Sequence, residues 1–203
     1  MHTFIKLLFN AITLAGIMVL SPMAMGESDQ DNACAGSCSA QARVAFTINV
    51  PGFLRFQVGS LASIDDVTFN VPANNVGDAS VVMANIGGDV AAGILTAKIA
   101  GNVGQITITE TNNGGGEGIL GTGTMMQVTQ NAIPYTDISC SSNDSDLVAP
   151  SLSDSGGNTS TPTLQGGSGV TQRSAEWTFT YLNTTVVEAD TYSGQVTYTA
   201  TDP

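Results

Sequence analysis

The stretch AEWTFTY at residues 175–181 decides the fold class. Aromatic and apolar side chains occupy every second position around Trp177, and threonines or a glutamate occupy the positions between them. A period of two is typical of a β-strand with one face in a core and the other in solvent. Trp177 is the only tryptophan of the chain, and this phase predicts that it is a core residue.

The same alternation recurs along the chain and is separated by glycine, proline and asparagine turns. The other predicted strands are 42–50, 53–58, 67–71, 80–84, 94–99, 105–110, 124–129 and 192–200. No segment after residue 26 has the period of a helix. Many short strands joined by turns predict an all-β protein, an immunoglobulin-like antiparallel β-sandwich of Greek-key type. A closed barrel is the alternative.

The first 26 residues predict a secretory signal peptide, because Lys6 precedes an apolar run that ends at Ser21-Pro22 and small residues follow. Cleavage after Gly26 would remove His2, the only histidine. Residues 27–41 are small and polar and predict a flexible leader. We expect residues 42–203 to form a single domain, with a long polar surface loop at about 139–169.

The charge balance limits the classes of partner. The chain has 17 acidic and 5 basic residues, which gives a formal net charge of −12. An acidic surface repels nucleic acid and anionic lipid, so neither is expected as a partner. No later stretch is long and apolar enough for a membrane span in the mature chain. Together with the predicted signal peptide, these features predict an exported protein. It would lie at the cell surface, outside the cell or in the periplasm.

The three cysteines, Cys34, Cys38 and Cys140, allow one disulfide within the chain and three pairings. Export to an oxidising compartment favours such a bond. A Cys34–Cys38 bridge would close a small loop. A bridge from either residue to Cys140 would join the leader to the domain and stabilise it more. The sequence leaves the pairing open.

Catalytic chemistry is not expected. Serine or cysteine nucleophiles need a base, and the mature chain would have no histidine. Lys98 lies opposite the apolar face of its strand, and Asp65-Asp66 lies in a polar loop. The acids of Asn143-Asp144-Ser145-Asp146 are weak calcium candidates, since the run lacks the glycine and glutamate of an EF-hand loop. We therefore expect a protein that is not an enzyme and needs no cofactor.

Two features point to a structural role. Tyr192 follows Asp190 by two positions at the start of a late strand, as in the tyrosine corner of Greek-key sandwiches. The segment 42–50 is strongly amphipathic, and its apolar residues share one face. They are Val44, Phe46, Ile48 and Val50. Such a segment can belong to its own sheet, or it can be lent to a neighbour whose groove takes the alternate side chains.

Both ends of the chain resemble a known family. The sequence QARVAFTINVP at 41–51, followed by Phe53-Leu54, is similar to the start of chaperone–usher fimbrial subunits of the coli surface antigen kind. The sequence ADTYSGQVTYTA at 189–200 resembles their last strand, of the form G-x-Y-x-G-x-V. The resemblance implies a pilus subunit that polymerises by donor-strand exchange. It also implies two partners, other copies of the chain and a periplasmic chaperone.

The sequence thus predicts an exported structural surface protein, a fimbria-like subunit that uses Val44, Phe46, Ile48 and Val50 for assembly. One alternative is a self-complete monomeric β-sandwich that binds a glycan or a protein through its loops at 112–118 and 139–169. A second alternative is a calcium-stabilised matrix or surface-layer protein.

Overall fold

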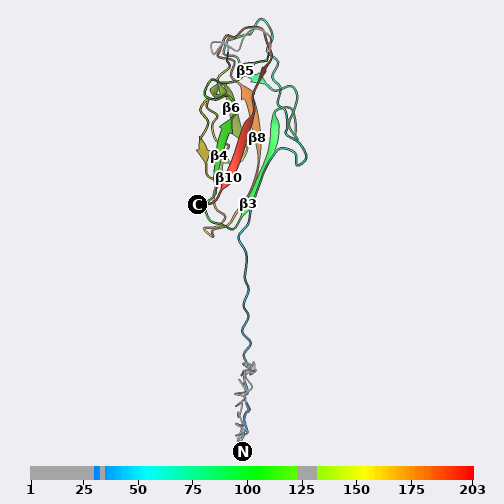
Figure 1. Cartoon of the computed structure of the whole chain (residues 1–203). Coiled ribbons are helices and arrows are strands. Elements are labelled where there is room, and N and C mark those ends of the chain that lie inside the picture. The colour runs from blue at the N-terminus through cyan, green and yellow to red at the C-terminus, as the bar shows by residue number, and fades with distance from the viewer. Residues whose placement is uncertain (1–29, 33–34, 123–131) are drawn as a thin grey trace, which may run out of the picture. The chain divides into compact units, whose positions relative to one another are not determined.

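A computed structural model describes residues 30–32, 35–122 and 132–203 (Figure 1). Residues 51–203 form one compact unit, which we call the body, and the residues up to Val50 form a second unit. The regular secondary structure of the body is almost entirely antiparallel β-sheet, and the one helical element in the described ranges is a 3₁₀ turn at Tyr135–Asp137. The predicted signal peptide at 1–26 and strand at 124–129 lie outside those ranges.

The larger sheet is built around the long strand β8, Thr171–Tyr181. On one edge β8 pairs with β3, Ile94–Gly101, and β3 pairs in turn with β1, Leu54–Val58. On its other edge β8 pairs with β6, Ile138–Ser142. A short strand β2, Val82–Met83, pairs with the end of β8 beyond β3. The order β1–β3–β8–β6 leaves β1 at one edge of this sheet.

The smaller sheet has β4, Thr107–Asn112, at its centre. It pairs with β10, Val196–Thr201, on one side and with β7, Thr159–Ser160, on the other. A two-stranded ladder joins β5, Leu120–Gly121, to β9, Tyr192–Ser193. Strand β10 therefore lies at the edge of the smaller sheet, as β1 does in the larger one.

The core lies between the inner faces of the two sheets, which gives the body a sandwich-like arrangement. Trp177 of β8 is fully buried, and its ring meets that of Tyr198 on β10 edge to face, with centroids 5.3 Å apart. Around this pair pack small and branched side chains from both sheets and the loops between them. They are Ala97, Ile99, Ile106, Ile108, Leu147, Ala149 and Ala175.

Most predicted strands in the body are present, with bounds shifted by a few residues. The strand predicted at 67–71 is wrong: this segment makes only an isolated bridge between Thr68 and Ile86. Phe69 instead packs its ring 6.2 Å from that of Tyr181. The segment ends at Pro72, which has no N–H to donate to a ladder.

The segment 42–50, predicted as a half-buried strand, belongs to no ladder. All nine of its residues are exposed. The alternation is present in the sequence, but the described part of this chain supplies no neighbouring strand that covers the apolar face. The prediction of a half-buried strand is therefore wrong for a single copy of the chain.

The segment predicted as a surface loop at 139–169 contains strand residues at both 139–142 and 159–160, and a few of its side chains between them reach the core. Leu147 is fully buried, and its carbonyl oxygen accepts a hydrogen bond of 2.9 Å from the Trp177 ring nitrogen. The side chain of Asn143 bonds to the backbone N–H of Glu176, at 2.8 Å, in the manner of a neighbouring strand. Polar composition misled the prediction because these polar groups pair with the backbone of β8 rather than with water.

The burial of Leu147 predicts that Leu147 and the adjacent Val148 contribute differently to the free energy of unfolding. Leu147→Ala empties a core site, so we expect it to lower the free energy of unfolding by about 2–5 kcal/mol. Val148 is 46 % exposed, so Val148→Ala should cost less than about 1 kcal/mol. Urea denaturation of the two variants measures both values. Equal small losses would contradict the burial of this segment.

Candidate functional site: an exposed apolar segment and an open sheet edge

The alternating segment, residues 42–50, exposes four large apolar side chains. Val44 and Val50 are each 74 % exposed, Ile48 is 83 % exposed and Phe46 is 85 % exposed. Each would contribute about 1.5–3 kcal/mol if it were buried. An extended segment that has an exposed apolar face and belongs to no ladder is suited to bind the edge of a sheet.

The body offers such an edge at β10. The backbone of Gln195 accepts a hydrogen bond from Asn113 on the side of β4, and this fixes the alternation along the strand. Thr197, Thr199 and Thr201 therefore direct their N–H and C=O groups toward β4, whereas Val196, Tyr198 and Ala200 direct theirs to the opposite edge. Among the described residues, no strand pairs with that edge.

The edge of β1 has the same character. The backbone N–H of Gly59 donates to the carbonyl oxygen of Thr96 on β3, and that of Asn102 donates to the carbonyl oxygen of Phe53. The odd-numbered residues of β1 therefore bond to β3. Leu54, Phe56 and Val58 then direct their backbone groups to the outer edge. Within the described ranges, β3 is the one strand that pairs with β1.

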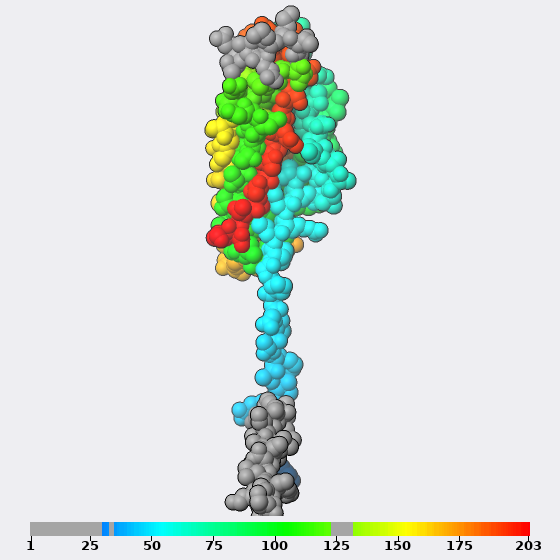
Figure 2. Space-filling model, in the orientation of Figure 1, coloured from blue at the N-terminus to red at the C-terminus, as the bar shows by residue number. Residues whose placement is uncertain are grey.

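The two open edges lie beside each other. Strands β1 and β10 are in contact, and Figure 2 shows β10, in red, on the surface next to the cyan chain of β1. The residues with edge-directed backbone groups also point their side chains inward. Leu54, Phe56, Val58, Tyr198 and Ala200 are only partly buried and pack on the core. We use the name edge groove for these partly buried apolar side chains together with the two backbone edges with which no strand of the described residues pairs.

The three residues that connect the alternating segment to β1 are held to the body by one side chain. Asn102 accepts a hydrogen bond of 2.7 Å from the backbone N–H of Phe53 through Oδ1. Through Nδ2 it donates one of 3.0 Å to the carbonyl oxygen of Pro51. No bend or turn occurs in residues 51–53. The chain therefore leaves the body at a defined point, which we call the base.

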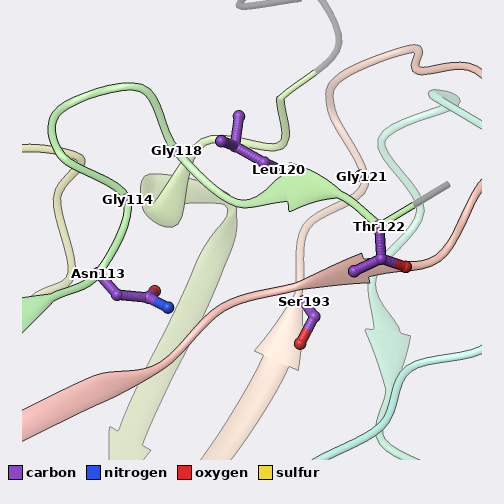
Figure 3. A pocket seen from close by; sticks show the side chains of 7 residues that line it. All are labelled: Asn113, Gly114, Gly118, Leu120, Gly121, Thr122 and Ser193. Carbon is purple, nitrogen blue, oxygen red and sulfur yellow. The ribbon is translucent and has the colours of Figure 1, made fainter. Parts of the chain in front are cut away.

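A shallow hollow of about 430 Å³ lies near the start of β10 (Figure 3). It is lined by Asn113, Gly114 and Gly118, by 120–122, and by Ser193. Its polar groups are already used: Asn113 Oδ1 accepts from Tyr135 and from the backbone of Gln195, and Thr122 donates to Thr191. None of the lining residues is charged, so the hollow lacks the convergent polar groups of a small-molecule site.

The two residues predicted to be structural occupy defined contacts. Trp177 joins β8 to the segment at Leu147 and to β10, as described above. The hydroxyl of Tyr192 donates a hydrogen bond of 3.0 Å to the carbonyl oxygen of Glu188, four residues upstream. That bond is the one that a tyrosine corner makes.

The cysteines fall into two groups. Cys38 is disulfide-bonded, and Cys34 lies outside the described residues. Cys140, on β6, is a free thiol, so of the pairings that the sequence left open, those from the leader to Cys140 are not formed. Burial raises the pKa of the Cys140 thiol to about 12, which keeps it protonated and unreactive.

The weak catalytic and metal candidates do not converge. Lys98 is exposed on β3, and Asp65 accepts a bond from the backbone of Ser60. Asp146 forms an ion pair of 2.9 Å with Arg173, while Asp144 accepts from the backbone of Asp146. Within the described ranges, no three His, Cys, Asp or Glu residues are placed to hold a metal ion.

A buried acid that the sequence reasoning missed is Glu110, which sits on β4 and is fully buried. Its Oε1 accepts a bond of 3.4 Å from Ser153, and its Oε2 has no partner in the structure. Its place in the apolar phase between Ile108 and Asn112 was the only available signal.

In the part of the chain that the structure describes, no helix has the length and apolar character needed to cross a membrane. Comparisons with protein-family models, with curated proteins and with solved structures return no match for this chain.

The buried thiol predicts a specific alkaline instability. The pKa of the folded Cys140 thiol lies above that of the thiol in the unfolded chain, so its contribution to stability is complete below about pH 9 and is lost as the pH rises toward 12. Burial also raises the pKa of Tyr135, Tyr181 and Tyr198.

Both the parent and a Cys140→Ala variant should therefore lose stability above pH 9, and the variant should lose less. Urea midpoints measured from pH 8 to 11 give the two slopes. Identical slopes would contradict the assignment to Cys140.

Proposed function

We propose that this protein is an exported, non-enzymatic structural subunit that assembles with copies of itself by strand donation. The alternating segment of one copy fills the edge groove of the next. The observation that carries the proposal is the pairing of two incomplete surfaces in one chain: a segment with four apolar side chains at least 74 % exposed, and a groove with half-covered apolar residues.

The order of the strands supports an immunoglobulin-like reading. In that fold, one sheet has the strands A, B, E and D, and the other has C, F and G. The chain order of β1, β3, β4, β6, β8 and β10 and their pairing match A, B, C, D, E and F. The position of a seventh strand, next to β10, has no occupant among the described residues. The alternating segment has the pattern and length for that position.

The alternation of apolar side chains in the segment matches the alternation of inward side chains on β10. On β10, the residues whose backbone faces the open edge also point their side chains inward. A strand paired there places the side chains of directly opposed residues on the same face. Val44, Phe46, Ile48 and Val50 share one parity, so all four would enter the groove together. The resemblance to fimbrial subunits at both ends of the sequence agrees with this mode of assembly.

A charge on the inward face tests the proposal. Phe46→Asp removes the burial of an aromatic ring and would place a carboxylate in an apolar groove, so it should weaken each joint by about 4 kcal/mol or more, roughly a thousandfold. We expect unheated secreted parent protein to give a ladder of SDS-resistant oligomers, and we expect Phe46→Asp to abolish this ladder. Thr47→Asp places the same charge on the other face and should leave the ladder intact. A normal ladder from Phe46→Asp would overturn strand donation.

A free peptide with the sequence of residues 42–50 should bind the empty edge groove of the Phe46→Asp variant and raise its melting temperature. At about 100 times its dissociation constant, a ligand stabilises the folded state by about 2.7 kcal/mol. For a body of this size that corresponds to a rise in melting temperature of roughly 5–10 °C. The same peptide with aspartate at position 46 should give no rise. Equal effects of the two peptides would show that the groove does not select the apolar face.

A further inference from the structure

The directions of the edge strands determine how two copies would meet, given the proposed strand donation on which this inference rests. Strand β4 follows β3 after the short turn 102–106 and runs back along the other sheet. Since β1 is antiparallel to β3 and β10 is antiparallel to β4, β1 and β10 run in opposite directions. A strand between them is antiparallel to one and parallel to the other.

The connection to β1 decides between the two directions. A strand antiparallel to β1 could come from the same chain through a hairpin, but residues 51–53 contain no turn and are bound by Asn102. A strand parallel to β1 needs a crossover of a dozen or more residues within one chain, so it must come from another copy. This direction also extends the smaller sheet with an antiparallel pair at β10, like every other pair in the body.

In this direction the end of the inserted segment, Val50, lies beside the start of β10 at Val196. Ser193 and the hollow adjoin that point (Figure 3). Three residues, 51–53, then separate Val50 from β1 of the donating copy, and three extended residues span at most about 10 Å. The base of the donating copy must therefore lie against the tip of the accepting copy that carries the hollow.

The two surfaces are suited to each other. Phe53, at the base, is a large apolar residue that is 53 % exposed, and Val103 lies beside Gly52. The hollow contains Leu120, and none of the described residues that line it is charged, although the carboxylate of Asp190 lies against Gly121.

We propose that the hollow between Asn113, Leu120 and Ser193 is the seat for the base of the neighbouring copy, with Phe53 and the 102–104 turn as its occupant. Consecutive copies thus make a second, body-to-body contact in addition to the inserted strand. The contact fixes the angle between bodies, because the connecting residues have no slack.

A photo-crosslinker placed at Ser193 of the full-length secreted protein tests this seat. Ser193 is exposed, so p-benzoylphenylalanine there should leave the fold unchanged. We expect mass spectrometry of the dimer band to show cross-links from position 193 of one copy to 51–53 or 102–104 of another. The same probe at the exposed Glu176, in the middle of β8 and away from the base, is the control and should give no such link.

The outcomes separate this inference from the proposed function. The protein could form the ladder while the Ser193 probe links to the tip or the sheet faces of the other copy, or to no other copy. Either result would overturn the seat and leave strand donation intact. If the parent protein forms no ladder, both the seat and strand donation are overturned.

A pair of variants gives a second readout. Phe53→Ser should speed dissociation of the oligomers roughly tenfold, with the melting temperature and the binding of the 42–50 peptide unchanged. Arg55→Ser, two residues along on the same exposed face, should leave the rate unchanged. Equal rates for Phe53→Ser and the parent would overturn the role of Phe53 in the seat.

Discussion

The buried Trp177 side chain is the contact on which the rest of the body depends. Its ring nitrogen donates to the carbonyl oxygen of Leu147, and its ring meets Tyr198 edge to face. One side chain thus connects the centre of the larger sheet, the long connection before β7, and the outermost strand of the smaller sheet. Because Tyr198 is on the last strand, this contact also holds β10 in place as one wall of the edge groove.

A consequence is that the inward side chains of the edge groove are held by packing within the body, although no strand of the described residues pairs with its two edges. Its inward residues rest on the same core that Trp177 organises. Tyr198 is the clearest case, since its ring packs on Trp177 while its backbone groups face the open edge. The hydroxyl of Tyr198 is buried without a partner, which marks the cost of keeping this wall in position.

Alternation in the sequence predicted which residues point the same way, but it could not predict what lies next to them. At 175–181 the neighbours are present, and the strand is buried as expected. At 42–50 the same pattern has no neighbour in its own chain, and at 67–71 it makes a single bridge. In the polar stretch at 139–169 a few apolar residues such as Leu147 are buried in the core, although most of the stretch is polar. The residues of the alternating segment could therefore be named from sequence, whereas the groove depends on which strands end up at the edges.

The coincidence of inward side chains and edge-directed backbone on β10 has an evolutionary consequence. A guest strand there is read only at every second position, while its other positions, such as Ala45, Thr47 and Asn49, face outward together with Thr197 and Thr199. Selection for assembly would act on the first set and leave the second set to drift. If copies assemble by strand donation as proposed, the outward-facing residues could thus vary without changing those that enter the groove.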